Sequence, residues 1–330
     1  MSILHFFSFA GLTMRAFPER GNPPAGALTQ GQFPAALDFC NQAANSCGAR
    51  HAAEKERAME FKATAYDVED RIATITLNRP HRSNAWTGRM HAEYRYLLGE
   101  ADADPSVSLV LVTGSGERFC VGGDSQALDG HSKSGAYDAG TPADLVTPGD
   151  TSFAPFAEDF AYHFALSKPV IAAINGAAAG VGLVLACYAD IRFAVPGAKL
   201  TTAHGPLNLP AEYGLSWLLP RLIGGARAME LLLSSRKFLT DEAHAIGLVH
   251  RLVAPDQLIA ETRAYALDLI ARVSPEALRQ TKRQTYLDFH RDVGASVRDA
   301  NALMSAMVKQ PDYKEAIAAF LGKRPADWSG

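Results

Sequence analysis

Two stretches of this sequence are apolar at nearly every position over the length of a β-strand. They are residues 108–113 and residues 168–174, and each is followed by a short turn that contains glycine, at Gly114 and at Gly176. A strand without a polar face is buried on both sides, which is typical of a parallel sheet covered by helices. These two runs therefore predict a layered α/β protein.

Other strands and helices alternate with these two runs, which predicts an α/β fold with a mainly parallel sheet. Beyond residue 225 the pattern is helical almost throughout, so we expect a helical C-terminal part. The further expected strands cover residues 71–77 and 190–194, and the expected helices cover residues 87–101, 155–165, 183–188, 226–234, 240–246, 256–272 and 275–289.

The sequence divides into three parts. Residues 1–58 contain several prolines and glycines and a polar run without a sustained apolar period, so we expect an irregular, poorly ordered N-terminal extension. Residues 59–255 carry the α/β pattern, and residues 256–330 carry the C-terminal helices. We expect the extension to take no part in the chemistry.

The charge and hydropathy of the chain disfavour a nucleic acid or a membrane as a partner. The 32 basic and 35 acidic residues give a net charge of -3, and no basic block is present. The apolar stretch at residues 3–12 is far shorter than the roughly 20 residues that cross a bilayer. No Lys or Arg precedes Arg15, which disfavours a secretory signal.

The four cysteines lack the spacing of a zinc site or a redox pair. We therefore expect free thiols in a reducing compartment, and hence a cytoplasmic protein without a metal site. The cysteines are Cys40, Cys47, Cys120 and Cys187.

Two glycine-containing segments follow expected strands and are candidates for binding an anion. One is Val121-Gly122-Gly123-Asp124, and the other is Gly180-Val181-Gly182 at the start of a helix. Glycine lets backbone N–H groups converge on a point where negative charge forms, and a helix N-terminus adds a favourable dipole. The alternatives are a turn in which Asp124 caps the next helix, and close helix packing at Gly182.

Neither segment fits a nucleotide-binding loop. The Gly180-Val181-Gly182 segment lacks the third glycine of a dinucleotide fingerprint, and the chain contains no Gly-Lys-Ser/Thr sequence.

The order and spacing of several short motifs resemble the enoyl-CoA hydratase/isomerase (crotonase) family over about residues 61–326. The resemblance implies a crotonase-like spiral of repeated ββα units, a C-terminal helical region that forms a homotrimer or homohexamer, and coenzyme A thioesters as substrates. Coenzyme A is then part of the substrate, and no separate cofactor is expected. The matching motifs are ITLNRP at 75–80, FCVGGD at 119–124, KPVIAAING at 168–176, ADI at 189–191, LLPRLIG at 218–224 and AIGLV at 245–249.

Carried over position by position, the resemblance places two backbone oxyanion donors at Gly123 and Val181. A backbone donor does not depend on the side chain, so valine is acceptable at position 181. The same comparison implies a substrate-binding path lined by Val121, Gly122, Asp124 and Gly180.

Two basic residues, Arg82 and Lys282, are candidate partners for the phosphates of coenzyme A. The alternative for each is a solvated surface charge, because long basic side chains usually keep their charged ends in water.

The sequence departs from the family where hydratases have two glutamates, because Val184 and His204 occupy those positions. Valine does not titrate, whereas histidine has a reference pKa near 6.5 and is able to act as a general acid or base. The alternative for His204 is a hydrogen-bonded structural histidine.

Glu212 is the favoured proton carrier, because it occupies the position where dienoyl-CoA isomerases of this family have an aspartate. Its alternative is a carboxylate that stabilises the N-terminus of the following helix.

Three classes of function stay open at this point. The first is hydration or double-bond isomerisation of an enoyl-CoA through a thioester enolate. The second is hydrolysis or decarboxylation of an acyl-CoA through a similar oxyanion, and the third is acyl-CoA binding without catalysis. The last follows from the absence of both glutamates.

Overall fold

The structure is a computed structural model that describes residues 61–136 and 145–328. The predicted N-terminal extension, residues 1–58, lies outside the described residues.

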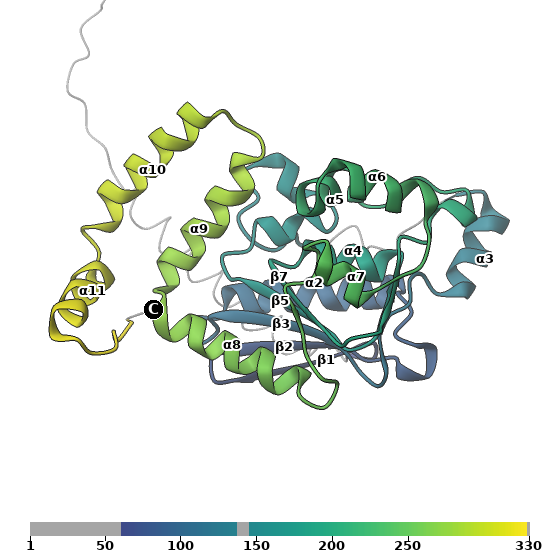
Figure 1. The fold of residues 1–330 in the computed structure, drawn as a ribbon, viewed down its shortest axis with the longest axis horizontal. Helices are drawn as coiled ribbons and strands as arrows, with labels where there is room; N and C mark the ends of the chain where they lie inside the picture. Colours follow the sequence, from purple (N-terminus) through teal and green to yellow (C-terminus); the bar gives the residue numbers. More distant parts are fainter. Residues whose placement is uncertain (1–60, 137–144, 329–330) are drawn as a thin grey trace, which may run out of the picture. The chain divides into compact units, whose positions relative to one another are not determined.

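The larger of two sheets has six strands in the order β1-β2-β3-β5-β7-β10 (Figure 1). Strands β1 and β2 are antiparallel, and each later neighbour is parallel to the one before. The prediction of a mainly parallel sheet is therefore confirmed. The strands are β1 (Thr64–Glu69), β2 (Ile72–Leu77), β3 (Leu109–Gly114), β5 (Val170–Ile174), β7 (Ile191–Ala194) and β10 (Arg251–Leu252).

The smaller sheet has four strands in the order β4-β6-β8-β9, and the first three are parallel. Its strands are β4 (Arg118–Cys120), β6 (Ala177–Ala179), β8 (Lys199–Thr201) and β9 (Phe238–Leu239).

The chain passes repeatedly from the larger sheet to the smaller one and then into a helix. Strands β3 and β4 precede helix α3 (Ser125–Ser134), and strands β5 and β6 precede α4 (Val181–Tyr188). In the same way, β7 and β8 precede α5 (Leu215–Ile223). This repetition is the expected spiral of ββα units, and it places the segments after β4, β6 and β8 at neighbouring positions along one sheet.

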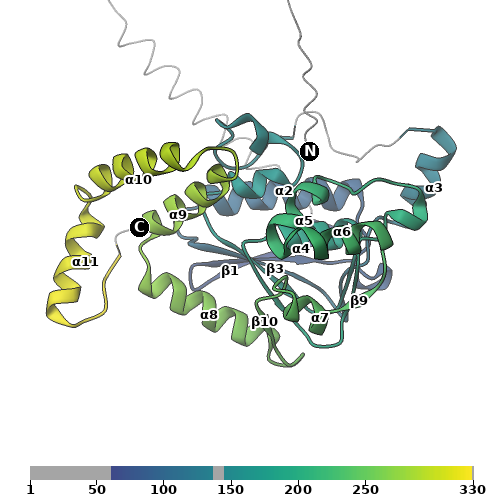
Figure 2. The ribbon, with the colours of Figure 1, turned by 45° about the horizontal axis from the view of Figure 1, so that its top comes forward.

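The central strands of the larger sheet are buried on both faces, as predicted from their apolar runs. Val110 and Val112 of β3 belong to one hydrophobic core, whereas Leu109 and Leu111 belong to a second. Helices α2 (Gly88–Ala103), α4 and α5 cover the first face, and α8 (Leu258–Arg272) covers the other (Figures 1 and 2).

The chain ends in further helices, as predicted, and α10 packs on α9. None of the helices within the described part of the chain is both long and apolar enough to cross a membrane. The remaining helices are α6 (Gly225–Ser234), α7 (Thr240–Ala245), α9 (Pro275–Asp288), α10 (Val293–Met307) and α11 (Pro311–Gly322).

The predicted helix at residues 155–165 is wrong. This segment contains two short 3-10 turns, η2 (Ala154–Ala157) and η3 (Ala161–Phe164). Phe160 lies between them with a φ of 62°, in the left-handed region, which interrupts any continuous right-handed helix. The fully buried ring of Phe160 packs among other aromatic rings, and this packing overrides the local helical pattern.

Candidate active site

The two glycine segments lie directly against each other. Gly122 and Gly180 have positive φ angles of 100° and 49°, which glycine tolerates far better than other residues. A Cβ atom added at Gly180 would lie 3.8 Å from the Cα atom of Gly122, and one added at Gly122 would lie 3.1 Å from the Ala179 carbonyl oxygen. The parallel pairing of β4 with β6 brings the two turns together.

Each glycine of this pair is followed by a residue whose backbone N–H is free. Across the described residues, the N–H groups of Gly123 and Val181 donate to no backbone carbonyl. Val181 is the first residue of α4, where an N–H has no intrahelical acceptor. Trp86 fixes the other segment, because its N–H donates to the Gly122 carbonyl at 2.8 Å and its carbonyl accepts from the Asp124 N–H at 2.9 Å. The two free donors are therefore attached to fixed backbone.

Gly182 allows the second segment to approach the first. A Cβ atom at Gly182 would lie 2.1 Å from the carbonyl oxygen of Cys120, at the end of β4. The start of α4 therefore rests against the strand that leads to Gly122 and Gly123. Gly182 has the packing role that the sequence offered as its alternative, and it lies in the candidate anion-binding segment.

The carboxylate of Glu212 lies beside the glycine pair. Its Oε2 atom would be 3.5 Å from a Cβ atom added at Gly180. Burial raises the pKa of Glu212 above its usual value. Helix α5 has Gly214 as its N-cap and receives no side-chain capping hydrogen bond within the described residues, so the Glu212 carboxylate does not cap this helix. A half-buried carboxylate next to two free N–H donors is suited to moving a proton near an oxyanion.

Val184 and His204, the two residues expected at the positions of the family glutamates, differ in character. Val184 is 1% exposed and is part of the hydrophobic core, so it contributes no acid or base. His204 is 7% exposed, and its Nδ1 atom has no hydrogen-bond partner within the described part of the chain. That unsatisfied nitrogen does not fit a fully hydrogen-bonded structural histidine.

Asp124 does not line an open path, contrary to the expectation. Its side chain is 4% exposed and accepts hydrogen bonds from the Gln126 N–H at 3.0 Å, from Arg79 at 3.0 Å and from Arg82 at 3.1 Å. Burial alone would raise the pKa of Asp124, but these hydrogen bonds hold it below its usual value. Asp124 is thus the N-cap of α3, which is the alternative interpretation of its motif. The side chain of Arg82 is 39% exposed. Val121, three residues before Asp124, is also exposed.

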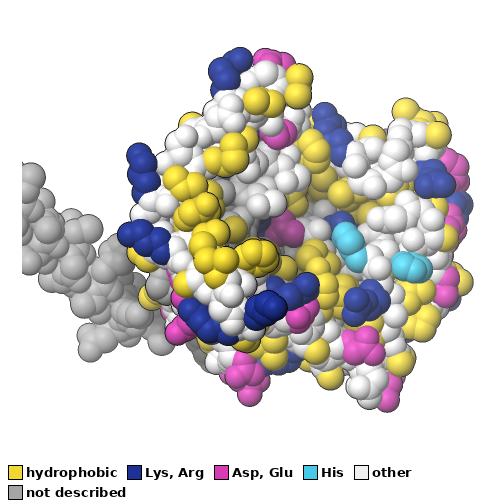
Figure 3. All heavy atoms as spheres, turned by 60° about the vertical axis from the view of Figure 1, so that its left-hand side comes forward, with side chains coloured by type: hydrophobic (Ala, Val, Ile, Leu, Met, Phe, Trp, Pro, Cys, Tyr) yellow, Lys and Arg dark blue, Asp and Glu magenta, His cyan; other side chains and the backbone are white. Residues whose placement is uncertain are grey.

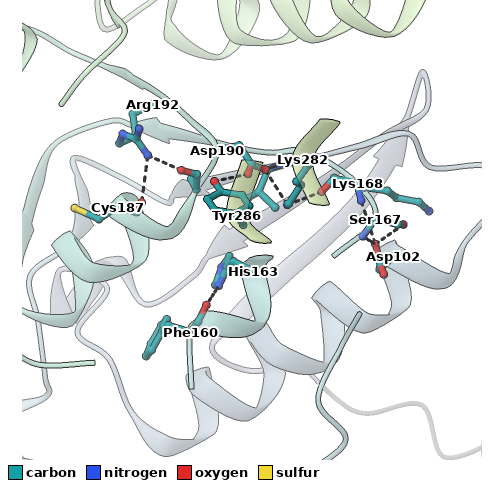
Figure 4. Close-up of polar contacts among 12 residues, drawn as sticks. Asp102, Phe160, His163, Ser167, Lys168, Cys187, Asp190, Arg192, Lys282 and Tyr286 are labelled. Carbon is teal, nitrogen blue, oxygen red and sulfur yellow. Dashed lines mark hydrogen bonds and ion pairs between the residues drawn. The ribbon is translucent and has the colours of Figure 1, made fainter. Parts of the chain in front are cut away.

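Lys282 is also placed differently from the expectation. Its ammonium group lies 2.8 Å from Asp190 Oδ2 and 2.9 Å from the Lys168 carbonyl oxygen, and its side chain is only 5% exposed (Figure 4). Asp190 also accepts a hydrogen bond from the Tyr286 hydroxyl at 2.7 Å. Because these contacts occupy the ammonium group inside the fold, we remove Lys282 from the candidate phosphate partners.

A second buried network supports the irregular turn at Phe160. His163 Nδ1 lies 2.7 Å from the Phe160 carbonyl oxygen (Figure 4), and its Nε2 lies 2.8 Å from the Tyr94 hydroxyl. Burial lowers the pKa of His163 to about 3, so the ring is neutral near pH 7. In the neutral ring, Nδ1–H donates to the carbonyl and Nε2 accepts from the tyrosine.

A cavity of about 440 Å³ has Tyr213 and Gly214, the two residues that follow Glu212, in its walls. The sequence analysis did not identify it. The high density of aromatic residues between positions 153 and 164 is the signal that would have pointed to it. The remaining wall residues are Pro155, Phe156, Glu158, Asp159, Ala161, Phe164, Tyr188, Trp217 and His290.

No group of three or more potential metal ligands occurs in residues 61–136 and 145–328.

Comparison with known proteins gives consistent matches over the α/β core and the C-terminal helices. The family model described as enoyl-CoA hydratase/isomerase matches residues 67–330. The 1,2-epoxyphenylacetyl-CoA isomerase of Escherichia coli is 32% identical over 274 residues, 80% of this chain and 97% of that protein. The crotonyl-CoA hydratase of Syntrophomonas wolfei is 30% identical over 272 residues, 82% of this chain and 99% of that protein. A crystal structure of an enoyl-CoA hydratase from Bacillus anthracis matches with a TM-score of 0.70 and 26% identity, covering 82% of this chain and all of the other.

Proposed function

The chain belongs to the enoyl-CoA hydratase/isomerase family, and from this premise we propose that it isomerises the double bond of an enoyl-CoA thioester. The observation that carries this proposal is the single half-buried carboxylate of Glu212 beside two free backbone N–H donors. Hydration of the double bond is the second candidate.

In the proposed reaction, the thioester oxygen accepts hydrogen bonds from the N–H groups of Gly123 and Val181. These donors stabilise the negative charge that reaches this oxygen when the substrate loses a proton and becomes an enolate. Removal of one such donor in other enzymes costs about 3 kcal/mol of transition-state stabilisation, so two donors lower the barrier substantially.

Glu212 supplies the proton transfer. The ionised carboxylate takes a proton from one carbon of the acyl group, and the released electron pair is shared between the neighbouring carbons and the thioester oxygen. Glu212 then returns the same proton to another carbon of the conjugated system, which moves the double bond without any other reactant. One carboxylate is enough for this reaction, and this chain has valine where the hydratases of the family have a first glutamate.

Hydration needs a group that positions and activates water, and one observation favours it. The buried Nδ1 atom of His204 lacks a partner among the described residues, so a bound water is a reasonable acceptor or donor for it. The name of the Syntrophomonas wolfei relative, crotonyl-CoA hydratase, also supports this candidate.

Incubation with 2-enoyl-CoA and 3-enoyl-CoA thioesters tests these functions together. Movement of the double bond, seen as a change in absorbance of the conjugated thioester without a change in product mass, supports isomerisation. A gain of one water in mass indicates hydration, and release of free thiol or carbon dioxide indicates hydrolysis or decarboxylation. Tight binding of acyl-CoA without any of these signals would leave only the non-catalytic alternative.

We also propose that the chain assembles as a homotrimer or homohexamer. Several large hydrophobic side chains of α10 and α11 are exposed, and Figure 3 shows hydrophobic side chains gathered on this side of the molecule. A contiguous apolar surface of this kind favours a protein partner. The exposed residues are Val293, Val297, Met304, Val308, Tyr313, Ile317, Phe320 and Leu321.

A further inference from the structure

We infer that the cavity beside Glu212 holds an uncharged acyl group that carries an aromatic ring. This inference rests on the proposed function, because it assigns the acyl half of the same thioester substrate. Four observations support it: the position of the cavity, the nature of its walls, the contacts that fix those walls, and the charges at its edge.

The cavity is connected to the proposed oxyanion site through two elements. Tyr213 and Gly214 follow Glu212 directly in the chain and form part of the wall. Tyr188, another wall residue, ends the helix that begins at Val181, about 10 Å away along the helix axis at 1.5 Å per residue. The Tyr188 hydroxyl donates to the Tyr213 carbonyl at 2.8 Å, which joins the two elements. An acyl group attached to a thioester at the glycine pair would run alongside α4 towards these walls.

The walls are formed largely by aromatic rings that hold one another in place. Phe164 contacts Phe156 in an edge arrangement at 5.8 Å between centroids, and it contacts Tyr188 at 5.1 Å. Trp217 stacks on His290 at 5.2 Å, and the Arg221 guanidinium lies 3.9 Å from the Trp217 centroid. Because each ring is restrained by its neighbours, the walls do not need to reorganise when a ligand enters.

Rigid aromatic walls favour a ring over a flexible alkyl chain. Aromatic rings gain a geometry-dependent attraction in edge-to-face and offset arrangements, beyond the burial of apolar area. An alkyl chain gains only the burial of area and also loses rotational freedom when it is fixed. The preference for a ring is therefore a property of these walls and not of apolar surface in general.

The charged residues at the cavity disfavour an acyl group with its own carboxylate. Glu158 and Asp159 both contribute to the wall. The neighbouring His91, whose Nε2 lies 3.5 Å from Asp159 Oδ1, and Arg95 at 3.2 Å hold the pKa of Asp159 below its usual value. A carboxylate at the end of the acyl group would face the carboxylate of Glu158 and that of Asp159, whose charge is already paired with Arg95.

Calorimetric titration with three thioesters tests the inference on the full-length protein. We expect phenylacetyl-CoA to bind about tenfold more tightly than hexanoyl-CoA, which has a similar reach without a ring; this factor corresponds to about 1.4 kcal/mol. We expect glutaryl-CoA, which ends in a carboxylate, to bind more weakly than hexanoyl-CoA.

Matched variants then test whether the walls cause the preference. Trp217→Leu keeps an apolar side chain but removes one ring, and we expect it to lose most of the preference for phenylacetyl-CoA. Tyr265→Leu makes the same type of change at a half-buried ring that packs on Phe193 and is not part of the cavity, so it should keep the preference. Should Trp217→Leu fail to fold, Phe156→Leu serves the same purpose.

The outcomes distinguish this inference from the proposed function. Equal affinity of the wild type for phenylacetyl-CoA and hexanoyl-CoA would overturn the ring preference while leaving the acyl-CoA function intact. Glutaryl-CoA binding as tightly as hexanoyl-CoA would overturn the exclusion of a charged acyl group. Failure of all three thioesters to bind would instead count against the proposed function itself.

Discussion

In the proposed reaction, the proton transfer depends on the ionisation of one side chain, Glu212. We expect Glu212→Gln to lower kcat by at least about 100-fold, because positioned acid–base groups contribute roughly that much or more. Binding of acyl-CoA should persist, since the backbone donors are unchanged. The matched variant is His204→Gln, which should retain most of the isomerase activity. A large loss in His204→Gln together with a small loss in Glu212→Gln would reassign the proton transfer to His204.

The same residue sets the pH dependence of the reaction. Glu212 accepts a proton only when it is ionised, so kcat/KM should fall as the pH falls through its pKa. Because burial raises that pKa, the fall should occur at a higher pH than is usual for a glutamate. The check is a pH profile of kcat/KM for the wild type and for His204→Gln, which should share this acidic limb. Its absence from the His204→Gln profile would contradict the assignment.

At the residue scale, the sequence identified backbone positions better than it identified the partners of charged side chains. Gly123 and Val181 each follow a glycine with the positive φ that its turn requires. Because that glycine is visible in the sequence, a motif is able to mark these positions. The location of Lys282 depends on Asp190, a residue 92 positions earlier. Whether a lysine reaches solvent or a buried partner is decided by folding, and no local pattern around residue 282 shows it.

At the scale of secondary-structure elements, the position of α4 depends on a single glycine. A Cβ atom at Gly182 would lie 2.1 Å from the Cys120 carbonyl oxygen, so Gly182→Ala should force α4 away from β4. We expect a loss of stability of about 1–3 kcal/mol, typical of overpacking, together with reduced activity because Val181 moves. The control is Gly130→Ala in α3, where an added Cβ meets nothing within 4 Å. Urea unfolding of both variants decides; equal midpoints would contradict the packing argument.

The attachment of α9 depends on the ion pair between Lys282 and Asp190. We expect Lys282→Met to lower the free energy of unfolding by about 3–5 kcal/mol, because it leaves a largely buried carboxylate without its charged partner. The double variant Lys282→Met with Asp190→Asn should recover part of this loss. Coenzyme A affinity, measured on the folded double variant, should match that of the wild type. A marked loss of affinity there would restore Lys282 as a phosphate partner.

The success of sequence prediction differs between elements for a physical reason. Strands β3 and β5 were predicted because both of their faces are buried, which requires apolar residues at successive positions. The segment around η2 and η3 was not, because its conformation follows from the packing of Phe160 and from the hydrogen bond between His163 and Tyr94, 69 positions earlier.

At the scale of the whole molecule, the exposed apolar surface of α10 and α11 bears on the assembly of the protein. We expect Phe320→Asp to shift the protein from a trimer or hexamer towards the monomer, because an 80% exposed phenylalanine would be replaced by a charge within the interface. Lys314→Asp, also on α11, changes a charge at an exposed polar position and serves as the control. Sedimentation velocity measures both; a wild-type protein that sediments as a monomer would overturn the proposed assembly.

The sequence predicts more of the overall fold than of any individual side-chain contact. The repeated order of strand, glycine turn and helix is visible in the sequence, and it becomes the alternation of the chain between two sheets. The aromatic cavity was missed because its walls come from η2, η3, α4, α5 and the turn after α9, which are brought together only in the folded chain.

The N–H groups of Gly123 and Val181 belong to the main chain, so any residue except proline at these positions retains them. The proposed oxyanion donors are therefore kept when side chains change, whereas the proposed proton carrier is a side chain that a mutation replaces. In the proposed mechanism, a mutation that moves the proton carrier from position 204 to position 212 would change the reaction without altering the two backbone donors. Such a scaffold is evolvable, and it is a suitable starting point for laboratory selection in which carboxylates are introduced at successive positions around the same two donors.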